Sequence, residues 1–115
     1  MSTEEGRLSD QHCAPCEGGV RPYSAAEAER ELAELDPAWR LDASGHGIGR
    51  ELRFKNFYQV MSFVNAVAHL ANREDHHPDL EIGYNYCRIR WTTHAIQGLS
   101  RNDFICAAKV DRLAG

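Results

Sequence analysis

Three histidines and one aspartate are the residues of this sequence whose types and positions best suit chemistry. His76 and His77 are adjacent and precede a proline, and His94 and Asp103 follow in the last quarter of the chain. Imidazole titrates near neutral pH, so it can act there as a general acid or a general base. A nearby carboxylate can fix its tautomer and stabilise its charged form, which makes Asp103 a candidate partner. These residues therefore predict acid–base catalysis.

The two adjacent histidines are expected to have different tasks. Because His77 precedes Pro78, its backbone is pushed toward an extended conformation. Neighbouring side chains in an extended segment project in opposite directions. We therefore expect one histidine to face a cavity, while the other contacts a different part of a ligand or the rim of the cavity.

Each of these residues also has a purely structural explanation. His76 and His77 on their own could belong to a solvated loop, and His94 could be a surface histidine at the end of a strand. Asp103 lies three residues after Ser100, which is the spacing of a capping box, so its carboxylate could serve a helix instead of a histidine. The joint spacing of the set favours the catalytic explanation, and for Asp103 both roles can hold together.

Helix signals begin early in the chain. Ser24 and Glu27 have the spacing of a capping box, and the helix that they begin is expected to end before Pro37. Asn56 is a good cap for a second helix, because an apolar stripe at helical spacing follows it over residues 57–73.

Two hairpins and a last helix complete the pattern. Ser100 is expected to cap the last helix, with Asp103 at its third position. The order α-β-β-α-β-β-α implies a four-stranded antiparallel sheet covered by helices on one face, an α+β two-layer sandwich. Alternating apolar and polar residues predict the strands over residues 39–42, 51–54, 80–84 and 87–92.

The bulk composition excludes several kinds of partner. The chain has 115 residues and a formal net charge of −4, which does not suit a nucleic-acid partner, because phosphate binding needs a basic face. It contains no apolar run long enough for a membrane span, and its polar, acidic start is unlike a signal peptide. We therefore expect a cytoplasmic protein with no membrane partner, whose four cysteines are thiols.

Residues 1–20 are expected to be a flexible N-terminal leader before a single domain over residues 21–115. The leader is polar, lacks periodicity and contains a proline and two adjacent glycines. Its His12, Cys13 and Cys16 could indicate a metal site, but a structural zinc site needs four ligands, typically with a second close pair. We therefore expect no metal.

The histidine segment resembles the signature of the pterin-4a-carbinolamine dehydratase family. The run His76-His77-Pro78 is followed after five intervening residues by Tyr84. Nine residues separate Tyr84 from His94, and eight separate His94 from Asp103. The likeness covers roughly residues 21–114. It also includes Arg50–Phe57, Thr93-His94 and Gly98-Leu99-Ser100, and the leader over 12–19 is similar to one seen in some bacterial members.

The resemblance implies a lyase that removes water from a 4a-hydroxytetrahydropterin, the product left by aromatic amino acid hydroxylases, and so serves tetrahydropterin recycling. It implies a pterin as substrate, no cofactor, and assembly as a homodimer or homotetramer. His76 and His94 would be the acid–base pair, with His77 binding and orienting the pterin. The substrate-binding residues that it implies are His77, Glu74, Asp75, Tyr84 and Thr93.

One position departs from the family pattern. The family usually carries a charged residue four positions before the first histidine, and this chain has Asn72 there. Glu74 and Asp75 are close to it and could serve instead. Tyr84 could line a pocket or simply pack against apolar neighbours.

Three other functions stay open on the sequence. The chain could be a dehydratase-like protein of another pterin pathway, such as molybdopterin metabolism. It could be a non-enzymatic dimerisation or interaction module, although such a module has no need of the histidine set. It could also bind a metal through its leader.

Overall fold

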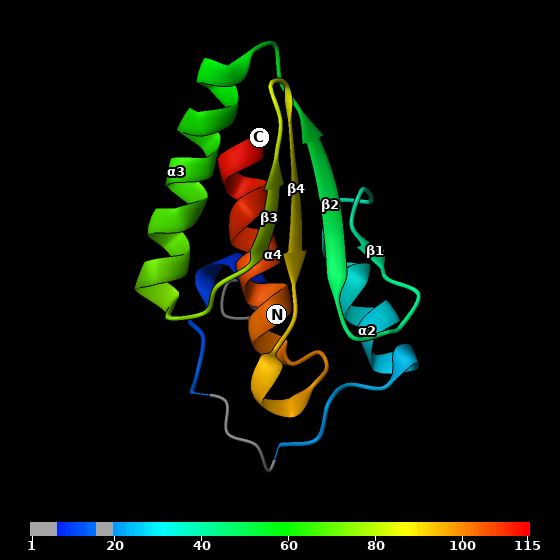
Figure 1. Cartoon of the computed structure of the whole chain (residues 1–115). Helices are drawn as coiled ribbons and strands as arrows, with labels where there is room; N and C mark the ends of the chain where they lie inside the picture. The colour runs from blue at the N-terminus through cyan, green and yellow to red at the C-terminus, as the bar shows by residue number, and fades with distance from the viewer. Residues whose placement is uncertain (1–6, 16–19) are drawn as a thin grey trace.

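The computed structural model describes residues 7–15 and 20–115, and its centre is a four-stranded antiparallel sheet (Figure 1). The strands are β1 Arg40–Leu41, β2 Ile48–Arg53, β3 Asp79–Ile82 and β4 Tyr86–Trp91. They stand in the order β1-β2-β4-β3, so the two predicted hairpins meet through β2 and β4. This central pair is in register over the whole of both strands, with Ile48 opposite Trp91.

Three α-helices lie on one face of this sheet, and in Figure 1 α4 crosses behind it. The fold is therefore the predicted α+β sandwich, with the predicted element order. No helix in the described ranges is long and apolar enough to cross a membrane. The helices are α2 Ala25–Leu32, α3 Phe57–Glu74 and α4 Arg101–Ala114, with the short 3-10 helices η1 Leu8–Asp10 and η2 His94–Ile96.

The helices begin at the predicted capping residues. The Ser24 hydroxyl accepts the N–H of Glu27, and the Glu27 carboxylate accepts the N–H of Ser24. Asn56 accepts the N–H of Gln59 at 3.0 Å. These bonds satisfy backbone donors that a helix start leaves unpaired, so the starts of α2 and α3 are encoded locally.

Two local predictions differ from the structure. Helix α2 ends at Leu32, well before Pro37, because the chain then turns and buries Leu35. Phe57, at the start of the predicted apolar stripe, is about half exposed, while Phe63 lies on the buried side of α3. Packing against the sheet therefore decided which apolar residues of α3 face inward.

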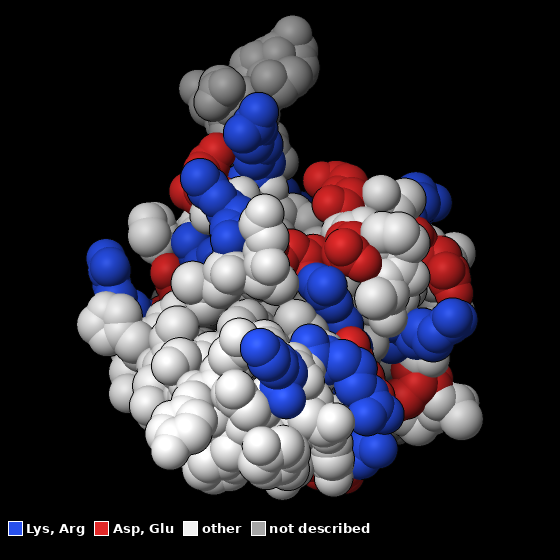
Figure 2. Space-filling model, turned by 90° about the horizontal axis from the view of Figure 1, so that it is seen from above, with Lys and Arg blue, Asp and Glu red and all other residues white. Residues whose placement is uncertain are grey.

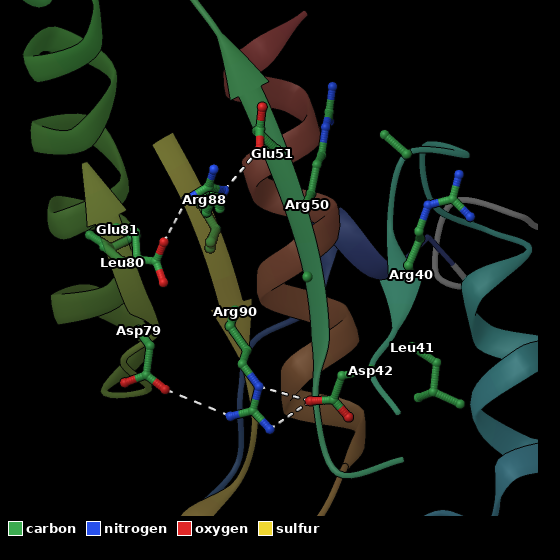
Figure 3. A pocket seen from close by; sticks show the side chains of 13 residues that line it. Arg40, Leu41, Asp42, Arg50, Glu51, Asp79, Leu80, Glu81, Arg88 and Arg90 are labelled. Atoms are coloured by element: carbon green, nitrogen blue, oxygen red, sulfur yellow. Dashed lines mark hydrogen bonds and ion pairs between the residues drawn. The ribbon is translucent and has the colours of Figure 1, made fainter. Parts of the chain in front are cut away.

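The two faces of the sheet differ in character. On β4, Cys87, Ile89 and Trp91 are buried beneath the helices. Arg88 and Arg90 alternate with them and lie on the open face (Figure 3). Ion pairs across the strands cover that face, joining Arg88 to Glu51 and Glu81, and Arg90 to Asp42 and Asp79.

A largely buried polar contact holds α4 against β2. Asp111 Oδ1 accepts from Arg50 Nη1 at 2.5 Å and from Trp39 Nε1 at 2.7 Å. Its second oxygen accepts the N–H of Asp36 at 2.9 Å. Because Asp103 lies about two turns earlier on the same helix, this contact also sets where Asp103 stands.

Residues 7–15, which belong to the leader expected from the sequence, contact the domain. Leu8 is buried in the hydrophobic core, and Lys109 Nζ donates to the carbonyl of Ser9 at 3.0 Å. Leu8 is the only buried side chain of this segment, and its other contacts are polar, so the polar composition does not reveal the docking. The segments 1–6 and 16–19, including Cys16, lie outside the described residues.

Candidate active site

The end of α3 and the starts of η2 and α4 lie at one end of the molecule (Figure 1), where a cavity of about 670 Å³ is found. This volume is typical of small-molecule sites, which span about 300–1,000 Å³. All three predicted histidines, His76, His77 and His94, line the cavity. The remaining lining residues are Arg73, Glu74, Asp75, Thr92, Thr93, Ala95 and Asn102, together with Cys13, Ala14 and Pro15 from the leader.

The end of α3 separates the two adjacent histidines. Asp75 adopts a left-handed conformation with φ of 54°, and its N–H bonds back to the last turn of the helix. The N–H of His76 also returns to that turn, onto the carbonyl of Ala71 at 3.2 Å. Such a cap reverses the chain direction, so His76 turns toward the core and His77 stays outside. Asp75 thus has a structural task as the residue that ends the helix.

His76 is held by a buried carboxylate. Its Nε2 lies 2.6 Å from Asp103 Oδ1, and its ring stacks on Trp91 with the ring centroids 5.7 Å apart. The His76 side chain is 12% exposed and that of Asp103 is 0% exposed. A carboxylate only accepts hydrogen bonds, so Nε2 carries the hydrogen and Nδ1 is the basic nitrogen of the neutral ring.

Asp103 serves the helix and the histidine at once, through different oxygens. Its Oδ2 accepts the N–H of Ser100 at 3.0 Å and the hydroxyl of Thr93 at 2.7 Å. Its Oδ1 accepts from His76. The capping box at the start of α4 is therefore present, and it fixes the carboxylate that orients the histidine. One side chain thus makes both of the contacts foreseen for Asp103, to the start of the helix and to a histidine.

His77 and His94 have more open surroundings. His77 Nε2 donates to Asn72 Oδ1 at 3.0 Å. Asn72, the residue that departs from the family pattern, therefore supports a histidine. His94 begins η2 and is exposed, and its side chain makes no hydrogen bond to any of the described residues. Its ring is therefore available to a ligand in the cavity.

Glu74 is occupied by the leader. Its side chain is 7% exposed; Oε1 accepts the N–H of Cys13 at 2.7 Å and Oε2 accepts from His12 Nδ1 at 2.9 Å. Burial raises the pKa of Glu74, but these two hydrogen bonds and the nearby charge of Lys109 outweigh it and hold the pKa below its ordinary value. Glu74 supports neither histidine, because its oxygens are already used.

Thr93 and Tyr84 are the two other residues that the resemblance implies for substrate binding. The Thr93 hydroxyl donates to Asp103, so it acts through that carboxylate although Thr93 lines the cavity. Tyr84 is 67% exposed and lies in the turn between β3 and β4, at the far end of the hairpin from His76. Asn102 and the leader residues were not predicted, because nothing local to Asn102 marks it and its contacts are with a segment far away in sequence.

A second and larger hollow lies on the open face of the sheet and has a volume of about 740 Å³ (Figure 3). Its lining contains no histidine, cysteine, serine or threonine, and Arg88 and Arg90 are paired with carboxylates. The histidine cavity is therefore the better candidate for proton-transfer chemistry. Within the described ranges, no group of three or more His, Cys, Asp or Glu residues is arranged to hold a metal ion.

Comparison with known sequences gives the same family over most of the chain. Residues 21–113 match the family described as Pterin 4 alpha carbinolamine dehydratase. A protein of Nitrosomonas eutropha, provisionally named as a pterin-4-alpha-carbinolamine dehydratase, is 58% identical over 106 residues, which are 92% of each chain. One of Legionella pneumophila with the same provisional name is 50% identical, over 92% of this chain and 94% of its own.

Solved structures share the fold. A Brucella melitensis protein described as a transcriptional coactivator/pterin dehydratase superposes with a TM-score of 0.78 at 28% identity, covering 83% of this chain and all of its own. A second structure, of a pterin dehydratase-like protein identified as a RuBisCO assembly factor in the alpha-carboxysome, gives a TM-score of 0.60 at 26% identity. That match covers 68% of this chain and 90% of the neighbour.

Proposed function

Because the chain belongs to the pterin 4 alpha carbinolamine dehydratase family, we propose that it removes water from a 4a-hydroxytetrahydropterin, as a step of tetrahydropterin recycling. The reaction breaks the bond between C4a and its hydroxyl oxygen, removes the proton of N5, and yields water and a quinonoid dihydropterin. Hydroxide is a poor leaving group, so the oxygen needs a proton, and N5 needs a base. The site therefore requires two groups that exchange protons near neutral pH.

The observation that carries this proposal is the bond between His76 and the fully buried Asp103. It keeps the hydrogen of the neutral ring on Nε2 and leaves Nδ1 as the proton acceptor. We assign to His76 the removal of the N5 proton. Asp103 is a positioning residue that stabilises the charged imidazole formed in this step.

His94 is assigned the complementary task of protonating the leaving hydroxyl. It lines the same cavity as His76 and is exposed, so it can regain its proton from water after each turnover. His77, supported by Asn72, is assigned to binding and orienting the pterin. General acid–base catalysis contributes about 10²–10⁴-fold in rate, which suits a dehydration that also proceeds slowly without a catalyst.

The test is a dehydratase assay that follows loss of the carbinolamine absorbance in wild type, His76→Ala and His94→Ala. We expect each variant to lose at least about a hundredfold in kcat while staying folded by circular dichroism. His69→Ala, an exposed histidine of α3 outside the cavity, is the matched control and should keep wild-type activity. A folded wild-type protein that does not accelerate the reaction over buffer would overturn the proposal.

The fold alone does not select an enzyme, because a neighbour with this fold is described as a RuBisCO assembly factor. The enzymatic proposal is favoured by three histidines in one cavity, one of them paired with a buried carboxylate. An interaction module has no use for that pair. Full retention of a binding partner by His76→Ala, with no dehydratase activity in wild type, would favour the module instead.

We also propose that the protein is a homo-oligomer. Figure 2 looks onto the end of the molecule where α3 begins, and uncharged side chains fill a continuous part of it. Tyr58 is 85% exposed there, and Phe54, Phe63 and Leu113 line a groove beside it. Light scattering should give the mass of a dimer or tetramer, and Tyr58→Glu should lower it; a monomeric wild type would refute this assignment.

A further inference from the structure

A short stretch of the leader forms part of the wall of the histidine cavity. Residues 12–15, called the strap below, run past the start of α4. Of these, Cys13, Ala14 and Pro15 line the cavity, and none of the three has a charged side chain. The strap thus adds small apolar side chains and backbone to a cavity that is otherwise lined largely by polar residues. A flat heteroaromatic ring needs both kinds of surface, apolar against its face and polar at its edge.

Asn102 binds the strap as a neighbouring strand would. Its Oδ1 accepts the N–H of Ala14 at 3.1 Å, and its Nδ2 donates to the carbonyl of Ala14 at 2.7 Å. Asn102 itself is buried. A side-chain amide is needed for this pair of bonds, because a carboxylate cannot donate and an apolar side chain can do neither.

The strap is also held at Cys13, one residue earlier. The N–H of Cys13 donates to Glu74, and the Cys13 sulfur lies 3.5 Å from that of Cys106, which is fully buried on α4. Glu74 and Asn102 lie close in sequence to His76 and Asp103, respectively. The two helix ends that position the proton-transfer pair therefore position the strap as well.

We propose that the strap is a substrate-contacting wall of the cavity and that Asn102 is the residue that positions it. This inference rests on the dehydratase function proposed above. The two titratable side chains of the strap already have partners, because His12 bonds to Glu74 and the Cys13 thiol lies against that of Cys106. We therefore assign the strap to substrate binding and leave the proton transfers to the histidines of the cavity. Loosening the strap should raise KM and leave kcat nearly the same.

The first experiment compares Asn102→Ala with wild type in the dehydratase assay. We expect KM to rise about tenfold, since two hydrogen bonds are lost, with kcat within about threefold. Ala14→Pro removes the N–H from the strap side and leaves α4 untouched, so it should reproduce the effect even if Asn102→Ala folds poorly. Asn65→Ala, an exposed asparagine of α3, is the control and should change neither constant.

The second experiment does not depend on turnover. Alkylation of Cys13, mapped by mass spectrometry, reports whether the strap is docked. The neighbouring Cys106 should react poorly, because the hydrogen bond to Cys13 and burial both raise the pKa of the Cys106 thiol. A non-reacting dihydropterin should slow the alkylation of Cys13 in wild type and should do so less at equal concentration in Asn102→Ala.

The two experiments separate the two ideas. An active wild type whose KM is unchanged in both strap variants, with Cys13 alkylation unaffected by the dihydropterin, overturns the strap inference alone. An inactive wild type overturns the dehydratase function, and the alkylation experiment then decides by itself whether the strap contacts a pterin. A fall in melting temperature with unchanged KM assigns Asn102 a structural role only and also overturns the inference.

Discussion

Replacing Asp103 by asparagine separates the two tasks of this carboxylate. The structure gives it three donors: the N–H of Ser100 and the hydroxyl of Thr93 on Oδ2, and His76 Nε2 on Oδ1. The asparagine oxygen can keep the first two, which preserves the cap. Its NH₂ group must then face His76 Nε2 and donate to it. The imidazole hydrogen is forced onto Nδ1, so the ring loses the basic nitrogen assigned to the N5 proton.

The magnitude follows from the step that is lost. Without a base in the correct tautomer, kcat of Asp103→Asn should fall by about 10²-fold or more, because general-base help is worth about 10²–10⁴-fold. The cap is retained, so the free energy of unfolding should change by only about 1–2 kcal/mol. Steady-state kinetics and urea unfolding measure the two quantities on the same preparation.

Ser100→Ala is the complementary variant. It removes the hydroxyl that caps α4 and keeps the carboxylate beside His76, so it should cost about 1 kcal/mol of stability and leave kcat within about threefold. The reasoning is refuted if Asp103→Asn, folded and of near wild-type stability, retains kcat within about threefold of wild type. Such a result would mean that the tautomer of His76 does not matter to the reaction.

Three further predictions follow from single contacts. Asn72→Ala removes the partner of His77, so KM should rise several-fold with little change in kcat in steady-state assays; an unchanged KM contradicts a binding role for His77. Asp111→Ala removes the carboxylate that accepts from Arg50 and Trp39, and it leaves the largely buried Arg50 with only the more exposed Asp36 at 3.7 Å. The free energy of unfolding should therefore fall by about 3 kcal/mol in urea titrations, whereas a loss below about 1 kcal/mol contradicts the stabilising role of this contact. The pKa of Glu74 is lowered on folding, so the stability that Glu74 gives the strap is complete above its ordinary pKa and is lost as the pH falls through the lowered value. The amide resonance of Cys13 in NMR spectra should therefore shift at acidic pH, when the strap is released. A Cys13 resonance that does not move contradicts this prediction.

Much of the fold is encoded locally in the sequence. Ser24, Asn56 and Ser100 cap the three helices, because each supplies an oxygen to a backbone N–H within three residues. The alternation of apolar and polar residues along β4 also predicts which of its side chains are buried and which are exposed, because it depends only on the two-residue period of an extended strand. The end of α2 and the orientation of Phe57 were not predictable in this way, because both depend on what packs against them.

The sequence by itself also determined which residues are candidates for proton transfer, through the types and spacing of the three histidines and Asp103. Only the tertiary structure decided their partners. His76 meets Asp103 across 27 residues, and Glu74 meets the leader across 61, so neither contact leaves a local pattern. The β3–β4 hairpin carries Tyr84 to the opposite end of the sheet although it is near His77 in sequence. Spacing along a chain constrains distance only within one element; between elements, the packing of α3 and α4 against the sheet sets it.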